Sequence, residues 1–337
     1  MRSGLEWSWW KGNATGSVVM LAKDELLDRV VDRVREQMPG DRTAQAEEFA
    51  RQYFAWIPRE DLDGRSPIDL YGAAMSHFGF AYQRSPGEAK VRVYNPLFEE
   101  HGWQSTHTAL EVVTDDMPFL VDSTRMEVNT RGYSIHLMLH PIMKVRRDDE
   151  GRLVEVLPAD AEEDDAISES VIHVEVDRQT EPEVLEELGA CTERVLSQVR
   201  AAVEDWPAML ERVGEVIEAF DEDPPPLDGE DLAEARAFLD WISDNNFTFL
   251  GYREYDLTPE NGEDALMGVE NTGLGILRET HRKPNSRSFA KLPPEVRRLA
   301  RRANILNLTK ANSRSTVHRP SSSRLSFIMG WSMRWME

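Results

Sequence analysis

A chain of 337 residues can hold two or three domains of modest size, each with its own apolar core. The net charge of −22 favours a soluble protein and argues against general affinity for nucleic acid, and the single cysteine, Cys191, excludes an internal disulfide framework. No apolar run approaches the roughly 18 residues of a membrane-spanning helix, and Glu6 and Lys11 interrupt any signal peptide, so a cytoplasmic protein without membrane or nucleic-acid partners is expected.

Changes in hydrophobic periodicity divide the chain into segments of different character. Helical spacing dominates the N-terminal part, strand-like runs appear after Glu88, and Pro224-Pro225-Pro226 indicates a stiff, exposed linker. The predicted segments are a doubtful extension at 1–20, a helical segment at 21–86, an α+β domain at 88–180, a helical segment at 181–245 with a proline-rich linker at 221–228, a strand with a basic linker at 246–320, and an atypical tail at 321–337.

Three helices are predicted in the N-terminal segment. Apolar residues spaced three and four apart predict an amphipathic helix over 21–37, and a second apolar face predicts another over 44–55. Ser66 followed by Pro67 is typical of a helix cap with proline at the first helical position, so a third helix should begin there and end near Phe78.

The segment after Glu88 predicts a ferredoxin-like domain, in which an antiparallel sheet carries helices on one face. Its elements alternate in the split β-α-β order: strand 107–114, helix 119–130, strand 133–145, strand 170–176 and helix 181–204. Asp116 is placed to cap the first of these helices. The order lacks a closing strand, and the run 247–256 is the best candidate for it.

Positive charge is concentrated in residues 278–324, where thirteen Lys and Arg residues face only Glu279 and Glu295. A basic helix is expected there over 294–303. The segment could be a patch for nucleic acid or membrane. Because Phe289 is its only aromatic residue, stacking on bases is disfavoured, and an arm that docks on acidic surface of the same protein is the preferred interpretation.

Metal and cofactor motifs are weak in this sequence. Asp115, Asp116 and Asp122 fit a turn, a cap and a first helical turn better than a metal site. Gly273-Leu-Gly275 lacks the third glycine and following helix of a dinucleotide loop, and no phosphate-binding loop or nucleophile motif occurs. We therefore predict no catalytic, cofactor-binding or metal-binding residue in the chain.

The histidines of the predicted sheet are the remaining potential metal ligands. His136 and His140 share one face of a strand, but their Cα atoms should lie about 13 Å apart, too far for one metal ion. His107 or His173 on neighbouring strands could approach one of them. Polar histidines on the surface of a sheet are the favoured interpretation.

The stretch from Val113 to Ile135 resembles the strand, turn and helix of ACT regulatory domains, which are ferredoxin-like modules. That resemblance implies an effector turn at Asp115, Asp116, Pro118 and Phe119 and makes 88–180 a first ACT-like domain. Ligand-binding ACT domains usually carry glycine where this chain has Phe119. A side chain at that place should block close approach of a ligand carboxylate to the backbone.

Several strings in the same order resemble the N-terminal region of the large bacterial NAD-specific glutamate dehydrogenases. They are Tyr94-Asn-Pro96, His101-Gly-Trp103, His107-Thr108, Asp115-Asp-Met-Pro-Phe-Leu-Val-Asp122, Ile135-His136, His140-Pro141, Asn246-Phe-Thr-Phe-Leu-Gly-Tyr-Arg-Glu-Tyr255 and Lys310-Ala-Asn-Ser-Arg-Ser-Thr-Val-His-Arg-Pro320. The resemblance covers roughly Leu21 to Pro320, after which a second ACT-like module would begin.

The resemblance implies a non-catalytic regulatory or assembly region of an NAD-dependent glutamate dehydrogenase, truncated before the catalytic domain. It further implies NAD in the complete enzyme but not in this chain, contacts with the rest of that polypeptide and with other subunits of a homo-oligomer, and an amino-acid effector. A free-standing ACT-type amino-acid sensor and an inactive fragment of a disrupted gene are the alternative interpretations.

Overall fold

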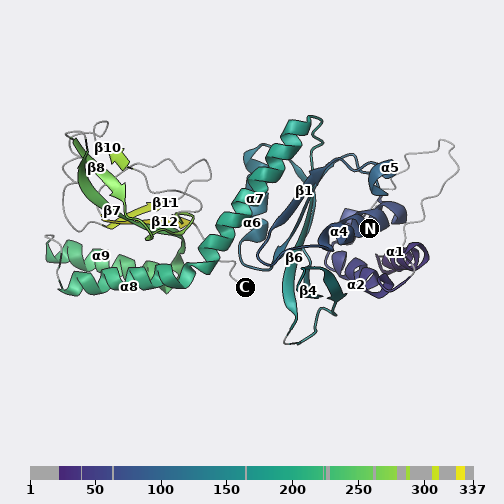
Figure 1. The fold of residues 1–337 in the computed structure, drawn as a ribbon, viewed down its shortest axis with the longest axis horizontal. Coiled ribbons are helices and arrows are strands. Elements are labelled where there is room, and N and C mark those ends of the chain that lie inside the picture. Colours follow the sequence, from purple (N-terminus) through teal and green to yellow (C-terminus); the bar gives the residue numbers. More distant parts are fainter. Residues whose placement is uncertain are drawn as a thin grey trace, which may run out of the picture.

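The computed structural model describes residues 23–38, 40–62, 64–163, 165–222, 224, 228–260, 263–278, 286–288, 306–310 and 324–330. Figure 1 shows two parts joined by the long helix α7 (Pro182–Glu204). The first part has a six-stranded sheet between two groups of helices. The second has another six-stranded sheet beside α8 (Trp206–Glu222) and α9 (Gly229–Trp241). The predicted α+β class is confirmed.

The N-terminal segment forms the helices α1 (Lys23–Gln37), α2 (Thr43–Tyr53), α3 (Arg59–Leu62) and α4 (Pro67–Ala81). The three longer helices lie where the periodicity and the Ser66-Pro67 start signal predict them. The Ser66 hydroxyl accepts a hydrogen bond from the Asp69 N–H at 3.1 Å, and Pro67 is the first helical residue, so the predicted cap is confirmed. The extension predicted at 1–20 lies outside the described residues.

The first sheet is antiparallel and consists of β1 (Lys90–Tyr94), β2 (Thr108–Asp115), β3 (Ile135–Leu139), β4 (Ile142–Arg147), β5 (Leu153–Val156) and β6 (Ile167–Val176). The central pair is β2 and β6, in register from Thr108 opposite Val176 to Asp115 opposite Glu169. β1 pairs with the other edge of β2, whereas β3 and β4 follow each other along β6. The short helix α5 (Phe98–His101) lies between β1 and β2.

Two details of the predicted sheet are wrong. The run 247–256, the candidate for the closing strand, lies in the second sheet, and β1, which precedes β2 in the sequence, pairs with the edge of β2 instead. The strand predicted over 133–145 is broken into β3 and β4 at His140 and Pro141. Proline has no N–H to donate to a ladder and therefore interrupts the pairing there.

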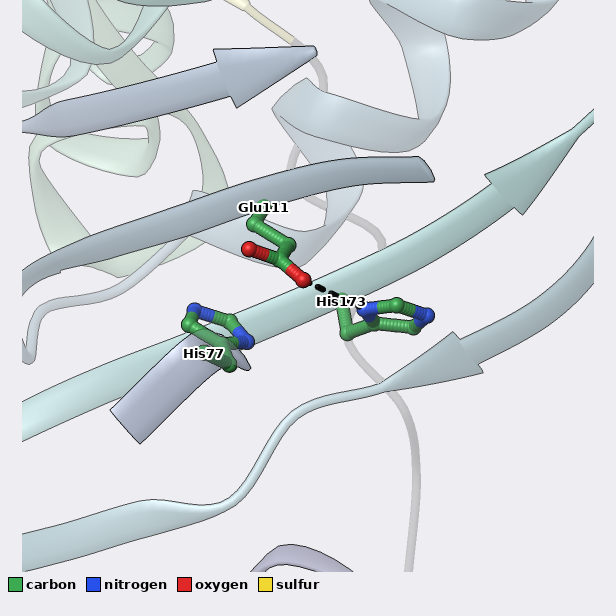
Figure 2. Close-up of side chains that lie close together, drawn as sticks. All are labelled: His77, Glu111 and His173. Carbon is green, nitrogen blue, oxygen red and sulfur yellow. Dashed lines mark ion pairs between the residues drawn. The ribbon is translucent and has the colours of Figure 1, made fainter. Parts of the chain in front are cut away.

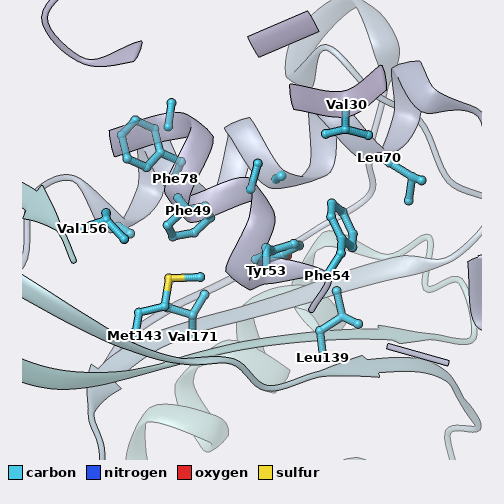
Figure 3. Packing of buried hydrophobic residues seen from close by; sticks show 14 of the residues in the cluster. Val30, Phe49, Tyr53, Phe54, Leu70, Phe78, Leu139, Met143, Val156 and Val171 are labelled. Atoms are coloured by element: carbon cyan, nitrogen blue, oxygen red, sulfur yellow. The ribbon is translucent and has the colours of Figure 1, made fainter. Parts of the chain in front are cut away.

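Both faces of the first sheet are covered by helices. On one face, Leu110, Val112 and Ile172 share a core with residues of α6 (Leu120–Thr130) and α7, as the ferredoxin-like order predicts. On the opposite face, the N-terminal helices pack on the sheet in the cluster of Figure 3, where Phe49 of α2 and Phe78 of α4 face β4 and β6. Consequently, seven of the eight residues of β2 are buried.

The second sheet contains β7 (Thr248–Glu260), β8 (Glu263–Gly268), β9 (Leu274–Gly275), β10 (Ser286–Ser288), β11 (Leu306–Lys310) and β12 (Arg324–Gly330), in the order β10-β8-β7-β12-β11 with β9 beside β7. A π-helix, η1 (Ile242–Asn246), precedes β7. The core of this second part contains Met209 and Val213 of α8 together with Phe249 and Tyr252 of β7. The helix predicted over 294–303 lies outside the described residues. Within the described part of the chain, no helix is long and apolar enough to cross a membrane.

Candidate functional site

The predicted effector turn connects the end of β2 to α6 and comprises Asp115, Asp116, Pro118 and Phe119. Two arginines bind Asp115: Arg84 Nη2 lies 2.6 Å from Oδ1, and Arg200 Nη2 lies 2.8 Å from Oδ2. Partial burial works to raise the pKa of Asp115, but hydrogen bonds and charge from the two arginines outweigh burial and hold the pKa below its ordinary value. The protein's own cations therefore engage this carboxylate.

Asp116 does not cap α6, contrary to the prediction. Its Oδ1 accepts a hydrogen bond from Ser170 Oγ at 2.6 Å, and its backbone N–H donates to the Ser168 carbonyl at 2.9 Å. The Ser170 hydroxyl is in turn 2.9 Å from His140 Nε2. These bonds fasten the turn to β6 instead of to the helix, whose N-cap position is held by Phe119 without a side-chain cap.

Phe119 adopts a backbone conformation that normally favours glycine. Its φ is 74°, in the left-handed region, where a Cβ costs roughly 1–2 kcal/mol. The chain thus keeps the glycine-like geometry expected of an ACT effector turn while it carries a large side chain there. That side chain is 40% exposed.

Pro118 and Phe119 line an apolar pocket of about 330 Å³, whose other walls come from the end of α7, the start of α8 and β7: Ala202, Val203, Trp206, Pro207 and Thr248. Asp115 and Asp116 are not among the lining residues, and none of the described lining residues is charged. The structure therefore brings together two of the four predicted turn residues and directs the carboxylates of the other two to internal partners.

A second polar cluster lies on the sheet face that carries the N-terminal helices. Figure 2 shows its centre: His77 of α4, Glu111 of β2 and His173 of β6. Each side chain is at most 1% exposed, and one potential ligand atom of each lies within 4.8 Å of the others. Glu111 Oε1 is 3.5 Å from His173 Nδ1, and His77 Nδ1 is 3.0 Å from the Tyr53 hydroxyl.

Arginines balance the carboxylates of this cluster. Arg92 binds Glu111 through Nε and Nη2, and the Tyr94 hydroxyl donates to Glu111 at 2.9 Å. Glu175, on the same face of β6 as His173, is bound by Arg65 at 2.6 Å. Burial works to raise the pKa of both glutamates, but the neighbouring histidines and arginines outweigh it and hold both pKa values well below the ordinary range.

The two buried histidines differ in their preferred charge. Burial lowers the pKa of His77 to about 4, so this imidazole is neutral near pH 7. Burial acts in the same direction on His173, but its hydrogen-bonding and charged neighbours Glu111 and Glu175 outweigh burial and raise the pKa of His173.

The sequence predicts the arrangement of the histidines only in part. His107 does approach His136: the two rings stack with centroids 4.1 Å apart, and His136 Nε2 lies 2.7 Å from Asp177. His173, however, is buried, and His77 is absent from the predicted set. A signal does exist, because Glu111 and His173 interrupt runs of apolar residues in strands covered on both faces, where polar groups need partners.

Comparison with known proteins places the chain in a family. Residues 49–191 match the family described as glutamate dehydrogenase, ACT1 domain. The chain is 40% identical to the NAD-specific glutamate dehydrogenase of Halomonas elongata over 303 residues. This match covers 89% of this chain and 19% of that enzyme. The corresponding enzyme of Pseudomonas aeruginosa is 37% identical over 81% of this chain and 17% of its own length. The NAD-specific glutamate dehydrogenase of Mycobacterium tuberculosis is 24% identical, and the match covers 71% of this chain and 14% of that enzyme.

The matched range begins within α2 and ends within α7, and it includes the effector turn and the buried cluster. The chain spans less than a fifth of the length of these relatives. The chain therefore belongs to the NAD-specific glutamate dehydrogenase family, as an N-terminal region that contains the family's ACT1 domain.

Proposed function

We propose that this chain is the non-catalytic regulatory and assembly region of an NAD-dependent glutamate dehydrogenase. The complete enzyme would act in the cytoplasm as a homo-oligomer and would oxidise L-glutamate with NAD and water to 2-oxoglutarate, ammonia and NADH. NAD would bind outside this chain, in which Leu274 and Gly275 form β9 and pair with β7. The support comes from family membership and from the way the effector turn is attached.

The effector turn connects three segments of the chain, and this observation carries the proposal. Arg84 follows the N-terminal helices and Arg200 belongs to α7, and both bind Asp115. Phe119 shares its pocket with Trp206 at the start of α8. Any displacement of the turn therefore changes contacts with the helices, the sheet and the second part together. A regulatory region needs such coupling between distant places.

An exposed aromatic side chain supports the assembly role. Trp56, just after α2, is 90% exposed. Burial of an indole side chain away from water is strongly favourable, so such exposure is unusual for a residue without a partner surface. Aromatic residues of this kind are enriched where protein surfaces meet. We propose that this side chain contacts the remainder of the dehydrogenase polypeptide or another subunit.

A chimera tests the proposal directly. In one variant of the Halomonas elongata enzyme the matched region would be replaced by this chain, and in another variant it would be deleted. We expect the replacement to keep NAD reduction and subunit assembly, and the deletion to lose assembly or its response to amino acids. A deletion that leaves turnover, oligomeric state and effector response unchanged would contradict the proposal. Glutamate-dependent NAD reduction by this chain alone would contradict its non-catalytic role.

The alternative of an amino-acid sensor is favoured by one observation, the pocket beside the effector turn. Its volume of about 330 Å³ could accept an apolar side chain, but its described lining offers no charge for an ammonium or a carboxylate group. Calorimetric titration with L-glutamate, aspartate, arginine and NAD separates the possibilities. We expect no saturable heat, whereas saturation by an amino acid would favour the sensor.

A further inference from the structure

Each histidine of the buried cluster has one ring nitrogen that makes no hydrogen bond of normal geometry. His77 Nδ1 is bonded to the Tyr53 hydroxyl, and His173 Nε2 lies 3.5 Å from Glu175 Oε1. The opposite nitrogens, His77 Nε2 and His173 Nδ1, are buried and make no hydrogen bond of normal geometry with the described residues, although His173 Nδ1 faces Glu111 Oε1 at 3.5 Å. Leaving such an atom unsatisfied costs about 1–3 kcal/mol, so two adjacent cases call for a physical explanation.

We propose that His77 Nε2, Glu111 Oε1 and His173 Nδ1 bind a divalent transition-metal ion, with Zn²⁺ as the best match. Two imidazoles and one carboxylate are a ligand set that zinc accepts. Zinc ligands in tetrahedral geometry lie about 3.3–3.5 Å from one another. The Glu111 and His173 atoms are already 3.5 Å apart, and His77 lies within 4.8 Å, so a shift of roughly 1 Å closes the site.

The surrounding contacts are those of a metal shell. A ligating histidine generally gives its second ring N–H to a carboxylate or another acceptor, which fixes its orientation. Glu175 is the neighbouring acceptor for the second ring nitrogen of His173, and the Tyr53 oxygen is the acceptor for that of His77. Glu111 is oriented by Arg92 on Oε2, which leaves Oε1 for the ion and for the Tyr94 hydroxyl.

The position of the cluster indicates a structural role for the ion. Its ligands come from α4, β2 and β6, so the ion would join the N-terminal helices to the centre of the ACT sheet. The three side chains are at most 1% exposed, so a substrate in solution could not reach the ion. The ion would therefore bind during folding and stabilise the packing of helix on sheet.

Zinc titration of the chelator-treated chain tests this site. We expect one equivalent of Zn²⁺ to bind and to raise the thermal midpoint of unfolding. His77→Gln should abolish both effects. The matched control is His136→Gln, the same change in a partly exposed histidine of the same sheet, which should keep stoichiometric binding.

A second variant keeps the proposal testable if His77→Gln does not fold. Tyr53→Phe removes only the hydroxyl that orients His77, and it should weaken Zn²⁺ binding by about 10–100-fold. Absence of stoichiometric binding in a folded wild-type chain would overturn the proposal, and the cluster would then be a buried ion network charged through His173. Binding that His136→Gln removes would overturn it too, since the ion would sit on the surface.

Discussion

Arg84 and Glu169 form an ion pair closed to solvent, with Nη2 and Oε1 2.6 Å apart and side chains that are 0% and 2% exposed. Glu169 is also bound by Arg147, whose Nε lies 2.6 Å from the same oxygen. Arg84 reaches Asp115 as well. The pair therefore connects the segment after α4 to β6 and to the effector turn. These are the segments through which we propose that movements of the turn are coupled to the N-terminal helices.

Replacement of the guanidinium in Arg84→Met is expected to lower the free energy of unfolding by about 3 kcal/mol, because it leaves a buried carboxylate with fewer partners. The loss should stay near the lower end of the usual range since Arg147 still neutralises Glu169. Urea unfolding measures it. The matched control is Arg29→Met, which removes an exposed pair with Glu25 and should cost less than about 1 kcal/mol. If both variants lost the same free energy of unfolding, burial of the Arg84 pair would not increase its contribution to stability.

Replacement of glycine by alanine is expected to have opposite effects on stability at two positions of α4. A Cβ at Gly72 would lie 2.5 Å from the Gly102 carbonyl oxygen and from Trp103 Cβ, so Gly72→Ala should destabilise the chain by about 1–3 kcal/mol. A Cβ at Gly79 meets nothing within 4 Å, and Gly79→Ala should stabilise by about 0.5–1 kcal/mol through helix propensity. Thermal unfolding of both variants checks the pair. Stabilisation by Gly72→Ala would mean that α4 can move away from the loop.

The strain at Phe119 can be isolated by comparing two small residues there. Both Phe119→Ala and Phe119→Gly remove the ring from the pocket, but only glycine tolerates the φ of 74° without a Cβ penalty. We expect the glycine variant to be more stable than the alanine variant by about 1 kcal/mol in chemical denaturation. If alanine were the more stable residue, the left-handed conformation would not persist in solution.

Local patterns in the sequence predict most helices and the central strands well. Their signals are short-range: the Ser66 cap, the apolar spacing of α1 and the β-branched run of β2 need no knowledge of distant residues. Sheet order is different, because the place beside β2 could be taken by any suitable strand. Only tertiary packing decides that β1 takes it and that β7 joins another sheet.

The candidate site is less predictable for the same physical reason. The position of the effector turn follows from a local motif, but the partners of Asp115 come from Arg84 and Arg200, far away in the sequence. The buried cluster joins His77 to two strands through the packing of α4. A helix with one histidine among apolar residues does not reveal this partnership by itself.

Acid should weaken the attachment of the effector turn. The folded-state pKa of Asp115 is held below its ordinary value by Arg84 and Arg200, despite burial acting the other way. The stabilisation is therefore present above the unfolded-state pKa of about 3.9 and is lost as the pH falls through the lower folded-state value. In unfolding measured from pH 6 downwards, Asp115→Asn should be less stable at pH 6 and should lose less stability below pH 4. Parallel curves would contradict this assignment.

The start of the basic segment 278–324 is held by acidic residues at the α7–α8 corner. Arg278 Nε lies 2.6 Å from Asp205 Oδ2, which also accepts the Gly275 N–H at 2.6 Å, and Arg278 Nη1 lies 3.0 Å from Glu204. Arg278, the first residue of the segment, thus binds acidic residues of the same chain, and docking of the segment as a whole stays a prediction.

Loss of this anchor should expose the chain to protease. Asp205→Ala removes two hydrogen bonds from Arg278 and one from the Gly275 N–H at once, so trypsin should cleave after Arg278 several-fold faster, because local opening limits access to the peptide bond. Mass spectrometry of the peptide ending at Arg278 gives the rate. Asp221→Ala, in the neighbouring helix α8, removes an exposed partner of Arg236 and should leave the rate unchanged. If the two variants were cleaved equally fast, Asp205 would not be the group that protects the bond after Arg278.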